Sequence, residues 1–370
     1  MERYILLFLL VMQTLEKSDV YFTKEISGEK IVEMFKKLNI KLEGNIGLKV
    51  HTGEQNGPYF LRPSFLKNIY DYTNGTFIEC NTAYEKGSRH LTSLHKELLK
   101  FNGWSQYRTI ILDEEDNTDL VLKVEKPYNI TQSYVGKRIQ DFNSCLVLAH
   151  FKGHGSGGFG GAMKQLSIGF ASRAGKSHIH SGGFSQDYKE CWKHRASQYD
   201  FTSAMADSAS MVTKYFKDKG GIAYINVLAN ISLKCDCSGT SAPKPEIRDI
   251  GILASTDPIA IDKACYDLIL KENNNGSKEW IKQAETKLAL NTLKVGEEKG
   301  MGTQDYNLID VDNKNDLWYV YYIIIPVAAL IVFGIVIVGI VMYIKKRKSL
   351  DVDDKEGQGL FGERETLKDE

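Results

Sequence analysis

The chain of 370 residues lacks several features, and each absence narrows its class. It has no net charge, because 47 lysines and arginines balance 47 aspartates and glutamates, so a protein that binds nucleic acid through a basic surface is disfavoured. With only 7 prolines and 42% apolar residues, most of the chain should fold around a full core. No Ser-His-Asp order, Walker loop, zinc-protease helix or nucleic-acid motif is present, so neither reaction nor substrate is readable from a motif.

A long uncharged apolar run lies near the C-terminus, from Ile323 to Ile344. Its length is close to the roughly 20 residues that cross a bilayer core. Aromatic residues precede it and a basic cluster follows: Trp318, Tyr319, Tyr321 and Tyr322, then Lys345, Lys346, Arg347 and Lys348. Because its length and both flanks disfavour a buried core helix, we predict a transmembrane helix over 323–344. Residues 313–322 are then a juxtamembrane stalk and aromatic belt, and 345–370 a cytoplasmic tail, which we expect to be disordered from Ser349 to Glu370.

The N-terminus has the pattern of a signal peptide. Arg3 precedes a short apolar run, Tyr4–Met12, and cleavage could fall in the polar segment Gln13–Asp19. We predict a signal peptide over 1–18, with an uncleaved signal anchor as the alternative. Residues 19–312 then lie outside the cytosol, which makes the chain a single-pass type I protein, integral to a membrane of the secretory pathway or cell surface.

Glycosylation sequons and cysteines are consistent with this topology. Four sequons fall on the outer side: Asn74, Asn129, Asn230 and Asn275. All six cysteines do so too: Cys80, Cys145, Cys191, Cys235, Cys237 and Cys265. An even number in an oxidising compartment permits disulfides, but sequence does not give their pairing.

Apolar periodicity predicts one layered α/β domain with a mixed, substantially parallel sheet. The expected strands are Ile46–Val50, Phe77–Ile78, Thr109–Leu112, Cys145–Phe151 and Ile222–Leu228. The expected helices are Ser27–Leu38, Thr92–Phe101, Phe201–Lys217 and Pro258–Lys271. Asp257 before Pro258 favours a helix cap over a metal ligand, and Cys265 on an apolar helix face is expected to be buried.

The segment 145–181 is rich in glycine and basic residues and contains no acidic residue. Gly155, Gly157 and Gly160 satisfy GxGxxG between a strand and an expected helix, where backbone N–H groups can face an anion. The nearby residues predicted to favour an anionic ligand are Lys152, His154, Lys164, Arg173 and Lys176. The acidic residue that would hold a ribose is missing, which disfavours a dinucleotide. A purely structural glycine loop remains an equal alternative to another anionic ligand.

Two residue pairs are candidate metal ligands. His178 and His180 would share one side of an extended strand, although such histidines are more often solvent-facing or hydrogen-bonded. Cys235 and Cys237 would likewise point the same way and could supply soft ligands. The alternative is that each thiol forms a disulfide with another cysteine.

Taken together, these stretches resemble the domain of unknown function 362 family, often labelled uncharacterised iron–sulfur-centre proteins. The matching segments are Gly47–Glu54, Arg62-Pro63, Asn81–Tyr84, Gly87–Arg89, Phe151–Ser181, Cys235–Cys237, Asp249–Cys265, Gly300–Gly302 and Tyr306–Ile309. Many members look like soluble proteins with a ferredoxin-like insertion that holds a four-iron–four-sulfur cluster. That insertion is missing here after Ser181, and Phe170 stands where members often have cysteine. The resemblance thus implies the fold and a Gly/His/Lys/Cys-lined site, with Lys49, His51 and Glu54 as polar site residues, rather than the cluster.

Two hypotheses follow. The first is a membrane-anchored protein, with or without enzymatic activity, whose outer domain binds a metal ion or an anionic cofactor. The second is a surface receptor or adhesion module that keeps the scaffold without cofactor chemistry. A thiol oxidoreductase is a third option, although the CxC spacing departs from the usual CxxC. The oligomeric state is not readable from the sequence.

Overall fold

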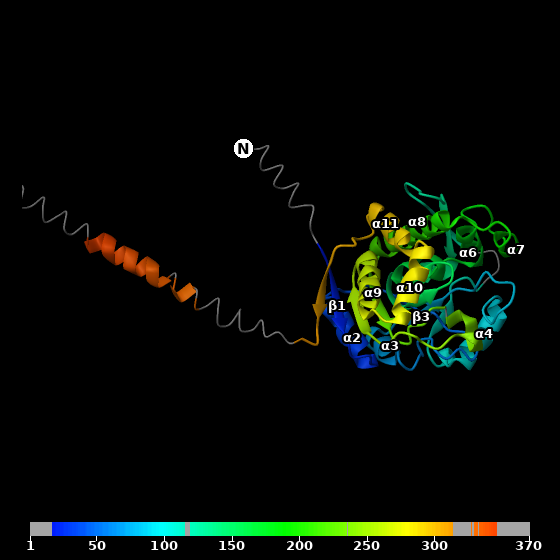
Figure 1. Ribbon diagram of the computed structural model, residues 1–370, viewed down its shortest axis with the longest axis horizontal. Coiled ribbons are helices and arrows are strands. Elements are labelled where there is room, and N and C mark those ends of the chain that lie inside the picture. Colours follow the sequence, from blue (N-terminus) through cyan, green and yellow to red (C-terminus); the bar gives the residue numbers. More distant parts are fainter. Residues whose placement is uncertain are drawn as a thin grey trace, which may run out of the picture. The chain divides into compact units, whose positions relative to one another are not determined.

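The computed structural model describes residues 17–114, 119–234, 236–313, 327, 329–331 and 333–345, with only the backbone described at 236–238. The chain forms two compact units, Met1–Asp312 and Asn313–Glu370. The first unit carries the sheet and its helices (Figure 1).

An eight-stranded sheet forms the centre of the first unit. Its strands, in spatial order, are β12 (Tyr306–Asp310), β1 (Ser18–Thr23), β11 (Gly251–Ser255), β10 (Ile222–Leu228), β7 (Ser144–His150), β2 (Ile46–Lys49), β3 (Thr76–Glu79) and β4 (Thr109–Ile111). Both pairings made by β11 are antiparallel, and the other pairings in this sheet are parallel. The predicted mixed, substantially parallel α/β domain is therefore confirmed.

Helices cover both faces of this sheet, as buried parallel strands require. They are α2 (Gly28–Lys37), α3 (Lys67–Thr73), α4 (Thr92–Phe101), α5 (Ala162–Lys164), α6 (Arg173–His180), α7 (Tyr188–Cys191), α8 (Gln198–Lys217), α9 (Pro258–Glu272), α10 (Asn275–Thr286) and α11 (Ala289–Glu298). Two small hairpins complete the described part: β5 (Asp119–Lys123) with β6 (Gln132–Gly136), and β8 (Lys152–His154) with β9 (Gly158–Gly160).

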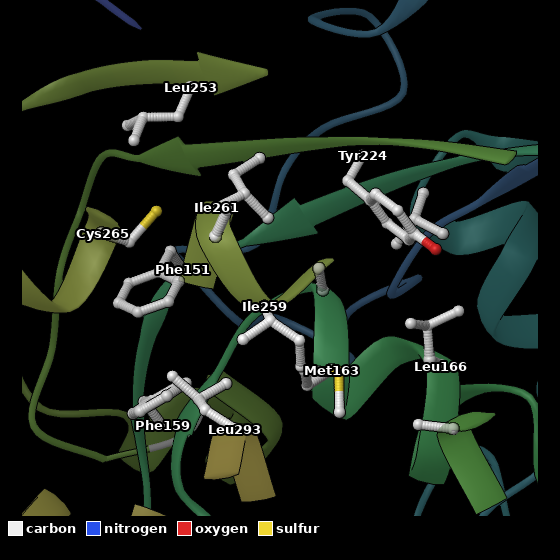
Figure 2. Close-up of a cluster of buried hydrophobic side chains, with 14 of the residues drawn as sticks. Phe151, Phe159, Met163, Leu166, Tyr224, Leu253, Ile259, Ile261, Cys265 and Leu293 are labelled. Atoms are coloured by element: carbon white, nitrogen blue, oxygen red, sulfur yellow. The ribbon is translucent and has the colours of Figure 1, made fainter. Parts of the chain in front are cut away.

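Alternate side chains of the central strands enter two separate cores. In β7, Leu146 and Leu148 pack in the core that contains residues of α2, α3 and α4. Cys145 and Val147 point the other way, into the core that contains residues of α8 to α11. Figure 2 shows part of this second core, where Tyr224 and Leu253 of the sheet lie with Ile259, Ile261 and Cys265 of α9. The buried position predicted for Cys265 is confirmed.

The capping role predicted for Asp257 is confirmed. Its Oδ1 accepts hydrogen bonds from the N–H groups of Ile259 (2.8 Å) and Ala260 (2.9 Å) at the start of α9. Its Oδ2 accepts from Ser18 Oγ at 2.6 Å and from Thr303 N at 2.8 Å. The same carboxylate therefore joins α9 to the first strand of the sheet.

The strands at one edge of the sheet were not predicted. β1 pairs with β12 in parallel, from Ser18 opposite Tyr306 to Phe22 opposite Asp310. Asp312 extends this contact, since its side chain accepts hydrogen bonds from Thr23 Oγ1 and Lys24 N, each at 2.7 Å. Ser18, the last residue of the predicted signal peptide, is thus the first residue of β1, and residues 1–16 of that peptide lie outside the described part.

The predicted membrane span belongs to the second unit. Residues 323–326, 328 and 332 of the span, residues 314–322 of the stalk and residues 346–370 of the tail lie outside the described residues. The described residues from 327 to 345 are helical, and their side chains are exposed. Within what is described, we find no helix that combines the length and the apolar character needed to cross a membrane.

Candidate functional site

The candidate site lies where the strand order reverses. From the centre of the sheet, β2, β3 and β4 follow one another toward one edge, whereas β7 and β10 continue in the opposite direction. The loops at the carboxyl ends of β2 and β7 therefore diverge, and ligands of open α/β sheets bind at such switch points. A cavity of about 60 Å³ is found there. It is lined by His51, Glu79, Thr82, Ala83, Tyr84, Arg89, His154, Lys164, Gln165, Ile168, Gly169, Lys176, His180 and Trp192.

Lys49, predicted as a site residue, is completely buried beside this cavity. Its ammonium group donates to Val50 O (2.7 Å), to Gln165 Oε1 (3.0 Å) and to the Glu79 carboxylate. An ammonium has three N–H donors, so these acceptors use all of them. Lys49 therefore holds Glu79 in place and has no donor left for a ligand.

Arg89 joins the other predicted residues of the β2 loop to Glu79. Its Nη1 donates to Glu79 Oε1 at 2.9 Å and its Nε to Glu54 Oε1 at 2.8 Å. Its Nη2 lies 3.1 Å from His51 Nε2. Arg89 thus contacts two of the predicted site residues, His51 and Glu54, and also Glu79. Neither Glu79 nor Arg89 was predicted as a site residue. Glu79 is the last residue of β3. Its position at the carboxyl end of a strand is the sequence feature that could have indicated it as a site residue.

Lys176 reaches the cavity from α6, and its side chain is only 7% exposed. Its Nζ donates to Ala171 O, and among the described residues it forms no ion pair with a carboxylate. Burial lowers the pKa of its ammonium, although Cys80, Asp113 and Glu79 partly oppose this effect. Lys176 is therefore a buried cation that faces the cavity, and its hydrogen bond to Ala171 O uses only one of its three N–H donors.

The glycine-rich loop forms the β8–β9 hairpin rather than a dinucleotide cradle. His154 Nδ1 accepts hydrogen bonds from Ser156 N (3.3 Å) and Gly157 N (3.0 Å), which closes the turn. His154 lines the cavity, whereas Gly155 and Gly157 are not among its described lining residues. This turn is consistent with the alternative that we left open, in which the glycine-rich loop has a structural role.

An internal carboxylate occupies the helix start that follows this loop. Asp262 accepts from Ala162 N (2.8 Å) and Met163 N (2.9 Å), the first N–H groups of α5. A Cβ on Gly161 would lie 2.4 Å from Asp262 Oδ1, so glycine is needed for this approach. Asp262 therefore occupies two N–H groups that could otherwise have faced an anionic ligand, and Gly160 just precedes this contact.

The predicted basic residues are divided between different surroundings. Lys164, at the end of α5, lines the cavity with Lys176. Lys152 is buried in β8 and is not among the described lining residues. The Arg173 guanidinium lies over the Tyr188 ring at 3.7 Å and lines a separate cavity. Arg173 and Lys152 thus do not join the site.

The strand predicted to hold His178 and His180 is wrong. His178 and His180 belong to α6 rather than to a strand, and residues two apart on a helix lie about 200° apart around its axis. His178 packs edge-on against Tyr134, whereas His180 lines the cavity and stacks on Phe201. Burial lowers the pKa of His180 to about 3. Among the described residues no group of three or more His, Cys, Asp or Glu side chains could hold a metal ion.

The predicted cysteine pair cannot be placed, because Cys235 and the side chain of Cys237 lie outside the described part. Cys80, Cys145, Cys191 and Cys265 are buried and free, so none of these four forms the disulfide considered as the alternative. Burial raises the pKa of the Cys80 and Cys145 thiols. Soft-metal binding by Cys235 and Cys237 therefore stays a prediction.

One wall of the cavity is aromatic. Tyr84 and Trp192 are stacked with their ring centroids 5.3 Å apart and their planes at 10°. The indole Nε1 of Trp192 donates to Ala83 O at 3.1 Å, which fixes the ring. Trp192 follows a short helix, and Tyr84 lies in an irregular loop. Neither residue belongs to a periodic apolar pattern, so the sequence gave no indication that the two rings stack.

The family comparison gives a match that covers more than half of the chain. The family described as "Domain of unknown function (DUF362)" matches residues 46–267. No curated protein matches the chain.

Two solved structures are distantly similar. One is a protein from Thermotoga maritima, with 14% identity and a TM-score of 0.39 over 74% of this chain and 59% of the other. The second is the lactate racemase apoprotein from Thermoanaerobacterium thermosaccharolyticum, with 12% identity and a TM-score of 0.35 over 65% of this chain and 57% of the other. The chain thus spans less than two thirds of either protein, and likeness at these TM-scores supports neither a shared ligand nor a shared activity.

Proposed function

We propose that this chain, which belongs to the DUF362 family, is a membrane-anchored protein whose folded domain binds a small anion at the switch point of its sheet. The observation that carries the proposal is Lys176, a buried ammonium that faces the cavity and forms no ion pair among the described residues. A buried charge is costly unless it is paired, so an anionic ligand is the natural complement.

The charges that line the cavity support this. Arg89, Lys164 and Lys176 are cationic, whereas Glu79 is the one acidic residue among the described lining side chains. Glu79 already pairs with both Lys49 and Arg89. Arg89 also pairs with Glu54, so Lys49 and Arg89 are balanced by Glu79 and Glu54. The charge of Lys176 therefore acts on the cavity, where exclusion of water strengthens it.

The size of the cavity limits the group that enters it. One water molecule needs roughly 10–15 Å³ on the same measure, so about 60 Å³ holds a few waters or a compact anionic group. A carboxylate or a phosphate meets this limit and accepts hydrogen bonds from Lys and Arg. We infer that the ligand presents one of these two groups.

We expect Lys176→Met to weaken binding of acetate or inorganic phosphate by roughly tenfold to a hundredfold, because a charge-assisted hydrogen bond is lost. Isothermal titration calorimetry on the purified chain measures the affinity. The matched control is Lys189→Met, since Lys189 is exposed on α7 and is not a described lining residue. Thermal unfolding of both variants checks that they remain folded.

The pH dependence provides a second measurement. Burial lowers the Lys176 pKa, and the anion needs the charged ammonium, so affinity should fall with rising pH before an ordinary lysine would deprotonate. Equal affinities of wild type and Lys176→Met would contradict the proposal. If neither anion binds the wild type, the alternative of a receptor or adhesion module without ligand chemistry is favoured.

The membrane anchor is supported by the composition of 323–344 and its flanks. Many apolar side chains between Val327 and Ile344 are half or more exposed, as on a surface that meets lipid. Of the predicted sequons, Asn74, Asn230 and Asn275 are exposed, which glycosylation requires, whereas Asn129 is partly buried.

A chain that ends after Asp312 is expected to be secreted into the medium, whereas the full chain stays in the membrane pellet after an alkaline carbonate wash. The truncated chain retains the compact unit Met1–Asp312 with all eight strands of the sheet. Fractionation followed by immunoblotting measures the distribution, and glycosidase treatment should lower the apparent mass of both forms. Release of the full chain by carbonate would rule out the integral anchor.

A further inference from the structure

The aromatic wall of the cavity belongs to a longer series of rings in contact with one another. Phe201 of α8 stacks on His180 with centroids 4.8 Å apart and planes at 13°. The His180 and Trp192 ring centroids are 4.7 Å apart with their planes tilted by 43°, and Trp192 stacks in turn on Tyr84. The series therefore runs from the core of the domain to the cavity wall, and three of its four rings line the cavity.

Tyr84 is the outermost ring of this series. Phe201 is buried, whereas Tyr84 is 43% exposed. Burial raises the pKa of the Tyr84 hydroxyl. Tyr84 therefore both lines the cavity and is partly accessible to solvent.

Two further contacts fix the position of the Trp192 ring and of the segment next to Tyr84. The Arg195 guanidinium lies over the Trp192 ring at 5.1 Å, and the hydrogen bond from Trp192 to Ala83 O fixes the residue next to Tyr84. A ring that is already positioned loses little conformational entropy when a ligand stacks on it. An exposed ring that is held in this way is suited to pack against a flat partner.

The cavity itself accommodates the anionic group and little more. A larger part of the ligand therefore extends out of the cavity, and Tyr84 is an exposed aromatic residue of the cavity lining. We propose that the ligand is a carboxylate or phosphate joined to a flat, unsaturated ring, and that this ring stacks on Tyr84 and extends the series Phe201–His180–Trp192–Tyr84 by one member. This inference rests on the proposed anion site and adds the chemical class of the ligand.

Three carboxylates separate the contribution of the ring from that of the charge. Benzoate carries a flat ring, cyclohexanecarboxylate a ring of similar size that is not flat, and acetate no ring. Titration calorimetry on the full chain in detergent should show benzoate binding about tenfold more tightly than cyclohexanecarboxylate, because only the flat ring stacks closely.

Variants of Tyr84 test the location. Tyr84→Leu should remove the preference for benzoate, whereas Tyr84→Phe, which keeps the ring, should retain it. Tyr72→Leu is the matched control, since Tyr72 is also exposed but lies on α3 and is not a described lining residue. Lys176→Met should weaken all three ligands by a similar factor.

The outcomes distinguish this inference from the proposed function. Equal affinities for benzoate and cyclohexanecarboxylate, with acetate still bound, would overturn the ring stacking and leave the anion site intact. A benzoate preference that survives in Tyr84→Leu would overturn the assignment to Tyr84. If none of the three carboxylates nor inorganic phosphate binds, the anion site fails and this inference fails with it.

Discussion

Replacement of Lys49 by methionine should lower the free energy of unfolding by about 3–5 kcal/mol, the usual cost of removing one partner from a buried ion pair. Lys49 is completely buried, and its ammonium is saturated by Glu79, Gln165 and Val50 O. Methionine fills a similar volume but leaves the Glu79 carboxylate with Arg89 as its remaining cation. Urea denaturation of the purified chain measures the loss.

Lys67→Met is the matched control for this variant. Lys67 also pairs with a carboxylate, that of Asp71, but both side chains are exposed on α3. Water screens such a pair, so the urea midpoint of Lys67→Met should match that of the wild type. A Lys49→Met midpoint equally close to the wild type would show that the buried pair does not hold the site together.

We expect Asp262→Asn to destabilise the fold by about 2–4 kcal/mol, because an amide cannot accept at both of its ends. One carboxylate oxygen of Asp262 accepts from Ala162 N and from Asn226 Nδ2, and the other accepts from Met163 N. In either orientation, the NH₂ group of asparagine would face a buried N–H donor. The change in thermal unfolding temperature measures the effect.

The pH dependence of stability offers an independent check on Asp262. Burial raises its pKa to about 6, above the ordinary value of 3.8. The folded chain therefore binds more protons than the unfolded chain between these values, so this group's contribution to stability decreases as pH rises from about 4 to 6. Asp262→Asn should lack this decrease, whereas Asp218→Asn, exposed after α8, should keep both the decrease and the wild-type stability. An unchanged profile in Asp262→Asn would contradict the assignment.

The centre of the fold was predictable because its signals are local. β7 and β10 are continuous apolar runs, as strands buried on both faces must be, and both were predicted to within one residue at each end. Asp257 and Pro258 together mark the start of α9. β12 gave no such signal, because this edge strand is only partly buried and half polar.

The site was only partly predictable, since its contacts join distant segments. The basic, acid-free window contains Lys164, Lys176 and His154, which line the cavity. The ion pairs of Glu79 instead depend on the order of the strands, which periodicity does not give. The error at His178 and His180 came from reading a two-residue spacing as a strand. Ser172, whose side chain accepts from Gly175 N and caps α6, was the overlooked sign of a helix.

The pairing of β1 with β12 has a mechanical consequence. The two strands run in parallel, so a force that pulls the start of β1 away from the end of β12 acts along both strands and loads their hydrogen bonds together. The bonds from Thr23 and Lys24 to Asp312 lie at the point where a tether beyond residue 312 would transmit that force. A domain attached to a membrane through β12 would therefore resist traction by shear across a whole strand, and would not unzip one residue at a time.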